Sequence, residues 1–372
     1  MNVPVSVLSS YIFFKIRFRP LKNSQKPFNI FIQKKGVTMQ KSFCFILGLT
    51  SACDKQCVLC CNNYDEIYKN VALDFDRLGP KLRDMRTFCT SELFKNRFDS
   101  VYVMLTGGEA FLYKQVDQEG KTRNLFDIIE AVQAEIPSVR IVIKTGGFFA
   151  HHQKTAQLWD RISRAYAYPE VEFRLGFNLY QKQGQGAEER LIDMTQRMFA
   201  HQKTAILDTI YDKNNLQRTA EMLEKGFQQL GFYLEKNTLV SLIQKNPEEH
   251  KRINMTNKMH KIFLDIGPAY APNLASAVYD YFEEAPNSCP TIDMYPNYLY
   301  YDAAFNLIHC NDSYIDASFP PIRLPVNTVL EEWLLMKERF ERLQQFLLTT
   351  QKQFKTRKER CFFCTKYVMK QD

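Results

Sequence analysis

The sequence lacks any apolar run near the ~20 residues that a helix needs to cross a bilayer, so no membrane span is expected. An obvious cleavable signal peptide is also missing, which argues against a secreted disulfide scaffold despite the ten cysteines. No internal repeat or low-complexity tract is present. Together these absences favour a globular protein in a reducing, cytoplasmic setting.

Acidic residues are absent from positions 1–53, whereas Lys and Arg are frequent there and again over 352–370. The formal net charge of +8 could suit nucleic acid or anionic lipid, but such a basic excess is more often a solvated face. A nucleic-acid partner is therefore not expected. Residues 1–40 are interpreted as a basic N-terminal extension, either disordered or an over-long start assignment, with a membrane-surface anchor as the alternative.

From residue 43 onward, apolar segments of strand type alternate with amphipathic helical segments, which is typical of a parallel sheet covered by helices. Strands are predicted over 43–49, 101–105, 139–144, 171–178 and 204–210, with a sixth over 232–234 or 238–243. Helices are predicted over 78–95, 125–136, 154–166, 186–199 and 215–229. This pattern predicts an α/β fold, a partial (βα)6 TIM-type barrel with its functional residues at the carboxyl ends of the strands.

The pattern also divides the chain into an extension over 1–40, the barrel over 41–243, a connecting segment over 244–288 and a small C-terminal α+β domain over 289–372. In the connection, 246–252 is predicted as a polar loop or short helix and 262–266 as a strand. Residues 299–301 and 307–309 flank a polar turn and predict a β-hairpin. A long helix is predicted over 328–356.

Three cysteines, Cys53, Cys57 and Cys60, follow the first predicted strand with the spacing C-x-x-x-C-x-x-C. Thiolates at this spacing can bind three irons of a [4Fe–4S] cluster and leave the fourth iron without a protein ligand. Zinc is the alternative, but a structural zinc site needs a fourth protein ligand, from Cys61 or a distant residue. The motif is interpreted as an iron–sulfur site.

With Gly107-Gly108-Glu109 at the end of the second predicted strand, the cysteine motif resembles the radical S-adenosylmethionine (SAM) superfamily. The resemblance covers about 43–235 and implies that the open iron binds SAM and cleaves it to a 5′-deoxyadenosyl radical. The glycines allow close approach of the backbone to a ligand, and the Glu109 carboxylate can accept hydrogen bonds from the SAM ammonium group. The family usually continues with Pro, where this sequence has Ala110.

Weaker matches imply further SAM contacts. Leu59 occupies the position that usually packs on adenine, and Thr145 begins a Thr-Gly-Gly segment where the family has Thr-Asn-Gly. Asn178 is either a ribose contact or a simple strand-ending Asn. The family's glycine-containing adenine motif on the fifth strand is not found. The implied cofactor-binding residues are Leu59, Gly107, Gly108, Glu109, Thr145 and Asn178, and no catalytic side chain is assigned.

Four further cysteines follow the predicted barrel, at Cys289, Cys310, Cys361 and Cys364. Their arrangement around the predicted hairpin and helix resembles the twitch domain, a shorter relative of the SPASM domain. It implies an auxiliary [4Fe–4S] cluster, with a four-cysteine zinc site as the alternative. Such a cluster, having no open iron, would relay electrons during an oxidative reaction or serve a purely structural role.

The resemblance implies a radical SAM oxidoreductase that abstracts hydrogen from a substrate, using an electron donor such as flavodoxin or ferredoxin. Oxidative modification of a peptide or protein is favoured, because the segment 244–288 could build a wide site. The alternatives are a small-molecule (aminocyclitol-like) radical dehydrogenase and a non-catalytic iron–sulfur or zinc-binding protein on the same barrel. Glu109 discriminates against the last, because it has no evident purpose without SAM.

Overall fold

The computed structural model describes residues 31–33, 42–53, 71–147, 153–166, 170–179, 186–201, 204–247, 250–268, 297–308 and 328–349. Within these ranges the fold is α/β and is built on one ten-stranded sheet. Its strands, in chain order, are β1 (Phe31–Gln33), β2 (Ser42–Gly48), β3 (Ser100–Thr106), β6 (Arg140–Thr145), β7 (Val171–Gly176), β8 (Thr204–Tyr211), β9 (Lys251–Thr256), β10 (Lys261–Pro268), β11 (Tyr298–Tyr301) and β12 (Leu307–Ile308). A separate hairpin pairs β4 (Lys114–Val116) with β5 (Thr122–Asn124).

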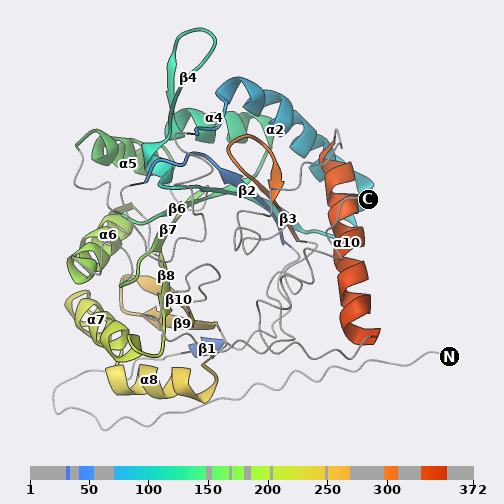
Figure 1. The fold of residues 1–372 in the computed structure, drawn as a ribbon. Helices are drawn as coiled ribbons and strands as arrows, with labels where there is room; N and C mark the ends of the chain where they lie inside the picture. Colours follow the sequence, from blue (N-terminus) through green and yellow to red (C-terminus); the bar gives the residue numbers. More distant parts are fainter. Residues whose placement is uncertain are drawn as a thin grey trace.

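The helices alternate with these strands. They are α2 (Phe75–Thr90), α3 (Glu92–Lys95), the 3-10 turn η1 (Ala110–Leu112), α4 (Leu125–Glu135), α5 (Gln153–Ala165), α6 (Ala187–His201), α7 (Leu216–Gln229), α8 (Lys236–Lys245) and α10 (Val329–Thr349). Figure 1 shows α5, α6 and α7 following one another along the same side of the curved sheet. No helix in the described ranges is long and apolar enough to cross a membrane.

Parallel strands make up the middle of the sheet. In the described part of the chain, β2, β3, β6, β7, β8 and β10 are parallel neighbours in that order, and β11 adds a further parallel strand beside β2. Parallel neighbours need crossover connections, which the helices between them provide. The carboxyl ends of these strands therefore lie along one edge of the sheet.

The first five predicted strands and the helices predicted over 125–136, 154–166, 186–199 and 215–229 are confirmed, but the predicted sixth strand is wrong. The helix predicted over 78–95 is divided at Ser91 into α2 and α3, and the one predicted over 328–356 is confirmed as far as Thr349, where the described range ends. Residues 236–245 form α8, and 232–234 lie in the loop before it. The buried residues of α8 are Leu239, Val240 and Ile243, a helical spacing that short β-branched runs can imitate. The sixth parallel strand is β10, which contains the strand predicted over 262–266.

The interpretation of 246–252 as a loop or short helix is wrong at its C-terminal end, because Lys251 and Arg252 begin β9. This strand pairs antiparallel with β10 and lies within the segment expected as a connection. Its other edge pairs antiparallel with β1, so the N-terminal extension contributes a strand to the sheet. The predicted hairpin near residue 300 is confirmed as β11 and β12.

The two faces of the sheet differ in character. One face packs against the helices, where Phe43 lies 5.3 Å from Phe88 of α2 and Phe173 lies 4.0 Å from Trp159 of α5, between ring centroids. The alternate residues point to the opposite face, here called the inner face. Several residues on the inner face are charged, so this face is not a purely apolar core.

A buried ion pair attaches α10 to α2, and a hydrogen bond to the same carboxylate attaches it to β11 of the sheet. The Glu332 carboxylate of α10 accepts bonds from Lys81 Nζ at 2.8 and 2.9 Å and from the Tyr301 hydroxyl at 2.5 Å. Lys81 also lies over the Tyr301 ring, 4.3 Å from its centroid. Burial, followed by the Glu332 charge, raises the pKa of Tyr301 well above its ordinary value. The hydroxyl therefore remains a donor to Glu332.

We expect Glu332→Ala to lower the free energy of unfolding by about 3 kcal/mol, because it leaves Lys81 charged in a mostly buried position. Chemical denaturation measures this change. The matched control is Glu338→Ala on the same helix, since the Glu338 side chain is 60% exposed and pairs with Arg342 along the helix surface. That control should cost less than about 0.5 kcal/mol. Equal effects of the two substitutions would contradict the role assigned to Glu332.

Candidate functional site

The predicted motifs gather at the carboxyl edge of the parallel strands. Cys53 follows β2, Gly107 to Glu109 follow β3, and Thr145 ends β6. Asn178, which is half-buried, lies two residues beyond the end of β7. Because β2, β3, β6 and β7 are successive neighbours, these segments lie side by side in the sheet.

A ladder of backbone hydrogen bonds joins the segment after β3 to the chain that leads to Cys53. Leu49 N donates to Thr106 O at 2.8 Å. Gly108 N donates to Thr50 O at 2.6 Å, and Glu109 N donates to Ala52 O at 2.8 Å. The pairing of β2 with β3 is thus continued past the strand ends, almost to the exposed Cys53.

Both glycines are required by this close backbone packing. Gly107 has φ +130°, and a Cβ there would lie 2.7 Å from Thr50 O. At Gly108 a Cβ would lie 2.4 Å from Ala52 O, a distance that real side chains do not show. The glycines therefore allow the segment to approach residues 50–52, in addition to any ligand that the site holds.

Glu109 ties the ends of β3 and β6 together. Its side chain is fully buried, with Oε2 accepting from Gly146 N at 3.0 Å and Oε1 from Phe111 N at 3.4 Å. Thr145, also buried, accepts from Gly147 N at 3.1 Å through Oγ1. A buried carboxylate needs such partners, because its desolvation is costly without them. The structure thus places a buried carboxyl group at the junction of three predicted motifs.

Several predicted site residues lie outside the described ranges: Cys57, Leu59, Cys60, Cys289, Cys310, Cys361 and Cys364. Their roles stay predictions. Cys53 is the one predicted cluster ligand within the described part of the chain, and there it is an exposed residue. In that same part, no three His, Cys, Asp or Glu side chains converge to hold a metal ion.

The structure also reveals a charged row on the inner face that sequence reasoning missed. It is formed by five residues from neighbouring strands: Lys144 (β6), Arg174 (β7), Asp208 (β8), Asp265 (β10) and Arg252 (β9). Arg174 Nη2 lies 2.9 Å from Asp265 Oδ2 and 3.8 Å from Asp208 Oδ1. Lys144 Nζ lies 3.5 Å from Asp208 Oδ2, and Arg252 bonds both oxygens of Asp265 at 2.6 Å.

The row is electrostatically coupled. Burial acts to lower the pKa of Arg174, but Asp208, Asp265 and Glu172 outweigh it and raise that pKa above its ordinary value. The hydrogen bond to Asp265 is the largest cause that raises the pKa of Arg252. Burial raises the pKa of Glu172, which lies nearer the amino end of β7. Both guanidinium groups of the row therefore stay charged.

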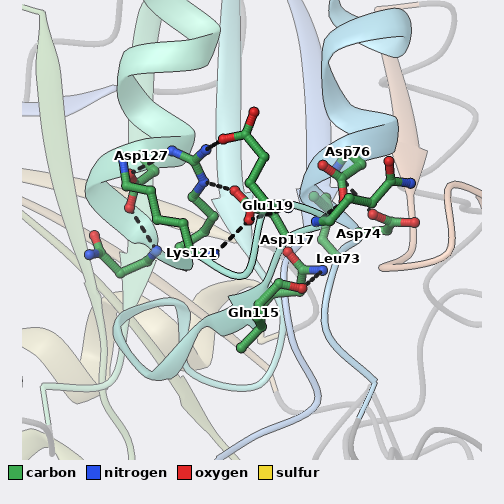
Figure 2. A network of polar contacts seen from close by, with 12 residues as sticks. Leu73, Asp74, Asp76, Gln115, Asp117, Glu119, Lys121 and Asp127 are labelled. Carbon is green, nitrogen blue, oxygen red and sulfur yellow. Dashed lines mark hydrogen bonds and ion pairs between the residues drawn. The ribbon is translucent and has the colours of Figure 1, made fainter.

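A second polar network fixes the chain that follows Glu109. Figure 2 shows Asp117, Glu119 and Lys121 in the β4–β5 turn, near Asp127 of α4 and Asp76 of α2. Asp117 accepts from Lys121 N at 2.8 Å and from Arg123 Nε at 2.5 Å. Asp76 Oδ2 accepts from Gln118 N at 3.0 Å. These bonds attach the projecting hairpin to α2 and thereby hold the segment between Glu109 and α4.

No protein-family model and no curated protein matches the sequence. Among solved structures, native anSMEcpe with bound AdoMet (SAM) is similar with a TM-score of 0.39 and 11% identity, over 64% of this chain and 55% of that one. BtrN in complex with AdoMet and 2-DOIA is similar with a TM-score of 0.34 and 12% identity, over 82% of this chain and 86% of that one. This chain thus spans about half the length of the first structure. At these scores the likeness assigns no function.

Proposed function

We propose that this chain is a radical SAM enzyme in which Cys53, Cys57 and Cys60 hold a [4Fe–4S] cluster. When bound, such a cluster supplies the electron that cleaves SAM to methionine and a 5′-deoxyadenosyl radical, which abstracts hydrogen from a substrate. The observation that carries the proposal is the backbone ladder between residues 50–52 and Gly107 to Glu109. These hydrogen bonds keep Cys53, the first predicted cluster ligand, close to Glu109, the residue proposed to bind SAM.

The residues at the strand edge fit this cofactor pair. Cys53 is exposed there, so its thiol is accessible to a cluster. Glu109, whose buried carboxyl group accepts from Gly146 N at this edge, is the residue proposed to bind the SAM ammonium group. Thr145 ends β6 and Asn178 lies two residues beyond the end of β7, and both are proposed to contact the rest of SAM. The chain's own contribution is to bind and orient SAM and to exclude water.

The proposal extends to the barrel, the substrate class and the electron donor. Six successive parallel strands support a partial (βα)6 barrel, with the substrate at its mouth. We propose an oxidoreductase that modifies a peptide or protein and takes electrons from a donor such as flavodoxin or ferredoxin. A small-molecule radical dehydrogenase is the second candidate, and the charged row favours it over an apolar peptide substrate.

The assignment is tested by electron paramagnetic resonance of the anaerobically purified, reduced protein. A cluster with an open iron should give a signal whose g-values change when SAM is added. A cluster signal that SAM leaves unchanged would contradict the proposal. Zinc in place of iron would instead favour a non-catalytic metal-binding protein, so metal content is measured on the same sample.

The auxiliary cluster predicted on Cys289, Cys310, Cys361 and Cys364 is tested separately. We expect a Cys361→Ala, Cys364→Ala double variant to lose about four irons per chain, because one [4Fe–4S] cluster would be missing. The SAM-dependent change of the remaining signal should persist, which separates the two clusters. Unchanged iron and sulfide per chain would refute the auxiliary cluster.

A further inference from the structure

The charged row contributes little as a purely structural device. Its five side chains are 21–47% exposed, and ion pairs that remain in contact with water contribute only about 0–1 kcal/mol each. The inner positions of a barrel-type sheet are ordinarily filled by Val, Ile and Leu. Here β6, β7, β8, β9 and β10 instead place five charged side chains in a continuous series of ion pairs.

The row has more positively than negatively charged groups. The cation with the weakest pairing is Lys144, which lies at the β6 end of the row. The row contains three cations, Lys144, Arg174 and Arg252, against two carboxylates. Asp265 is bonded by both arginines, at 2.9 and 2.6 Å, whereas Asp208 is shared at 3.5 and 3.8 Å. Lys144 thus has the more distant ion pair, and its side chain is 46% exposed.

That end of the row adjoins the candidate site. Lys144 directly precedes Thr145, and its neighbour Ile143 pairs with Leu105, close to the start of the Gly107 to Glu109 segment. On the other side Lys144 pairs with Arg174. A group bound by these two cations would therefore lie beside the place proposed for SAM, where a substrate must lie to lose a hydrogen atom.

We infer that the charged row binds an anionic group of the substrate, a carboxylate or a phosphate, through Lys144 and Arg174. The inference rests on the proposed function for the identity of the substrate, but the binding itself does not depend on SAM cleavage. Asp208 and Asp265 position the two cations and limit their net charge. The substrate class is thus an acid, either a small metabolite or an acidic peptide side chain.

The test is a titration of the anaerobically purified full chain, without SAM or reductant, at constant ionic strength. Glutarate and inorganic phosphate are the probes, and isothermal calorimetry is the measurement. At least one probe should bind saturably. Lys144→Gln should weaken it about fivefold, because a partly exposed charge contact is lost. Asp208→Asn should tighten it about fivefold, because a competing carboxylate is removed.

The control is Lys154→Gln, an exposed lysine of α5 on the helix-covered side, which should leave the affinity unchanged.

A capped triglutamate peptide, compared with its triglutamine counterpart, distinguishes the two sources of the anion. Tighter binding of triglutamate than of glutarate indicates an acidic peptide, and the reverse indicates a small acid. No saturable binding of any probe, or equal affinities in Lys144→Gln and Asp208→Asn, would overturn the inference. If the anion binds in this titration but the reduced, cluster-loaded chain cleaves no SAM in a separate assay, the proposed function is overturned and the anion site is not.

Discussion

Gly108→Ala is expected to lower the free energy of unfolding by about 3 kcal/mol and to reduce 5′-deoxyadenosine formation about 100-fold. The added Cβ would lie 2.4 Å from Ala52 O and 2.8 Å from Ser51 O, so one of the two backbone segments must move. Either movement breaks the hydrogen bond from Glu109 N to Ala52 O. Cys53 and Glu109 would then lose their relative placement. Chemical denaturation and a SAM-cleavage assay measure the two effects.

The matched control is Gly120→Ala in the β4–β5 turn. Gly120 has φ +78°, but no atom lies within 4 Å of the position that a Cβ would occupy there. Alanine there should cost about 1–2 kcal/mol through backbone strain alone and leave SAM cleavage unchanged. Loss of SAM cleavage in both variants would mean that activity merely follows stability, which would contradict the special role of Gly108.

Cys53→Ala is expected to remove the SAM-responsive cluster and to reduce 5′-deoxyadenosine formation by more than about 100-fold. Two thiolates cannot hold the cluster with one open iron in the manner that three do. The protein should still fold, because Cys53 is exposed and contributes no buried side chain. Iron content, the paramagnetic signal and a thermal melt of the same preparation measure these outcomes.

Cys89→Ala is the corresponding control. Burial raises the pKa of Cys89 to about 12, so its thiol stays protonated and is a poor metal ligand. Cys44 has the same property for the same reason, with a pKa also raised to about 12. Iron content in Cys89→Ala should therefore equal that of the unmodified chain. A loss of iron as large as that in Cys53→Ala would contradict the proposal that Cys53 binds the cluster and Cys89 does not.

The parallel strands and long helices could be predicted because their apolar residues repeat at strand and helix periods. The prediction failed where that signal was short. Leu239, Val240 and Ile243 form too few positions to separate a helix from a strand, and β9 was missed because Arg252 and Asn254 dilute its apolar pattern. Pairing between β1 and β9 joins residues more than 200 positions apart, which no local pattern encodes.

The candidate site was predictable only in part. Gly107, Gly108 and Glu109 were found by their motif, but their backbone contacts with residues 50–52 depend on the order of strands in the sheet. The charged row shows this limit more clearly. Arg174 and Asp265 belong to strands far apart in the chain, and from its local sequence each resembles an ordinary polar strand residue. Only the strand order brings them into contact.

The central claim is tested most directly by measuring 5′-deoxyadenosine formed from SAM by the anaerobically purified, cluster-loaded and reduced chain. The account predicts that 5′-deoxyadenosine and methionine form in equal amounts, and that neither forms with Cys57→Ala. A fully loaded cluster that yields no 5′-deoxyadenosine, with or without an acidic substrate present, would contradict it.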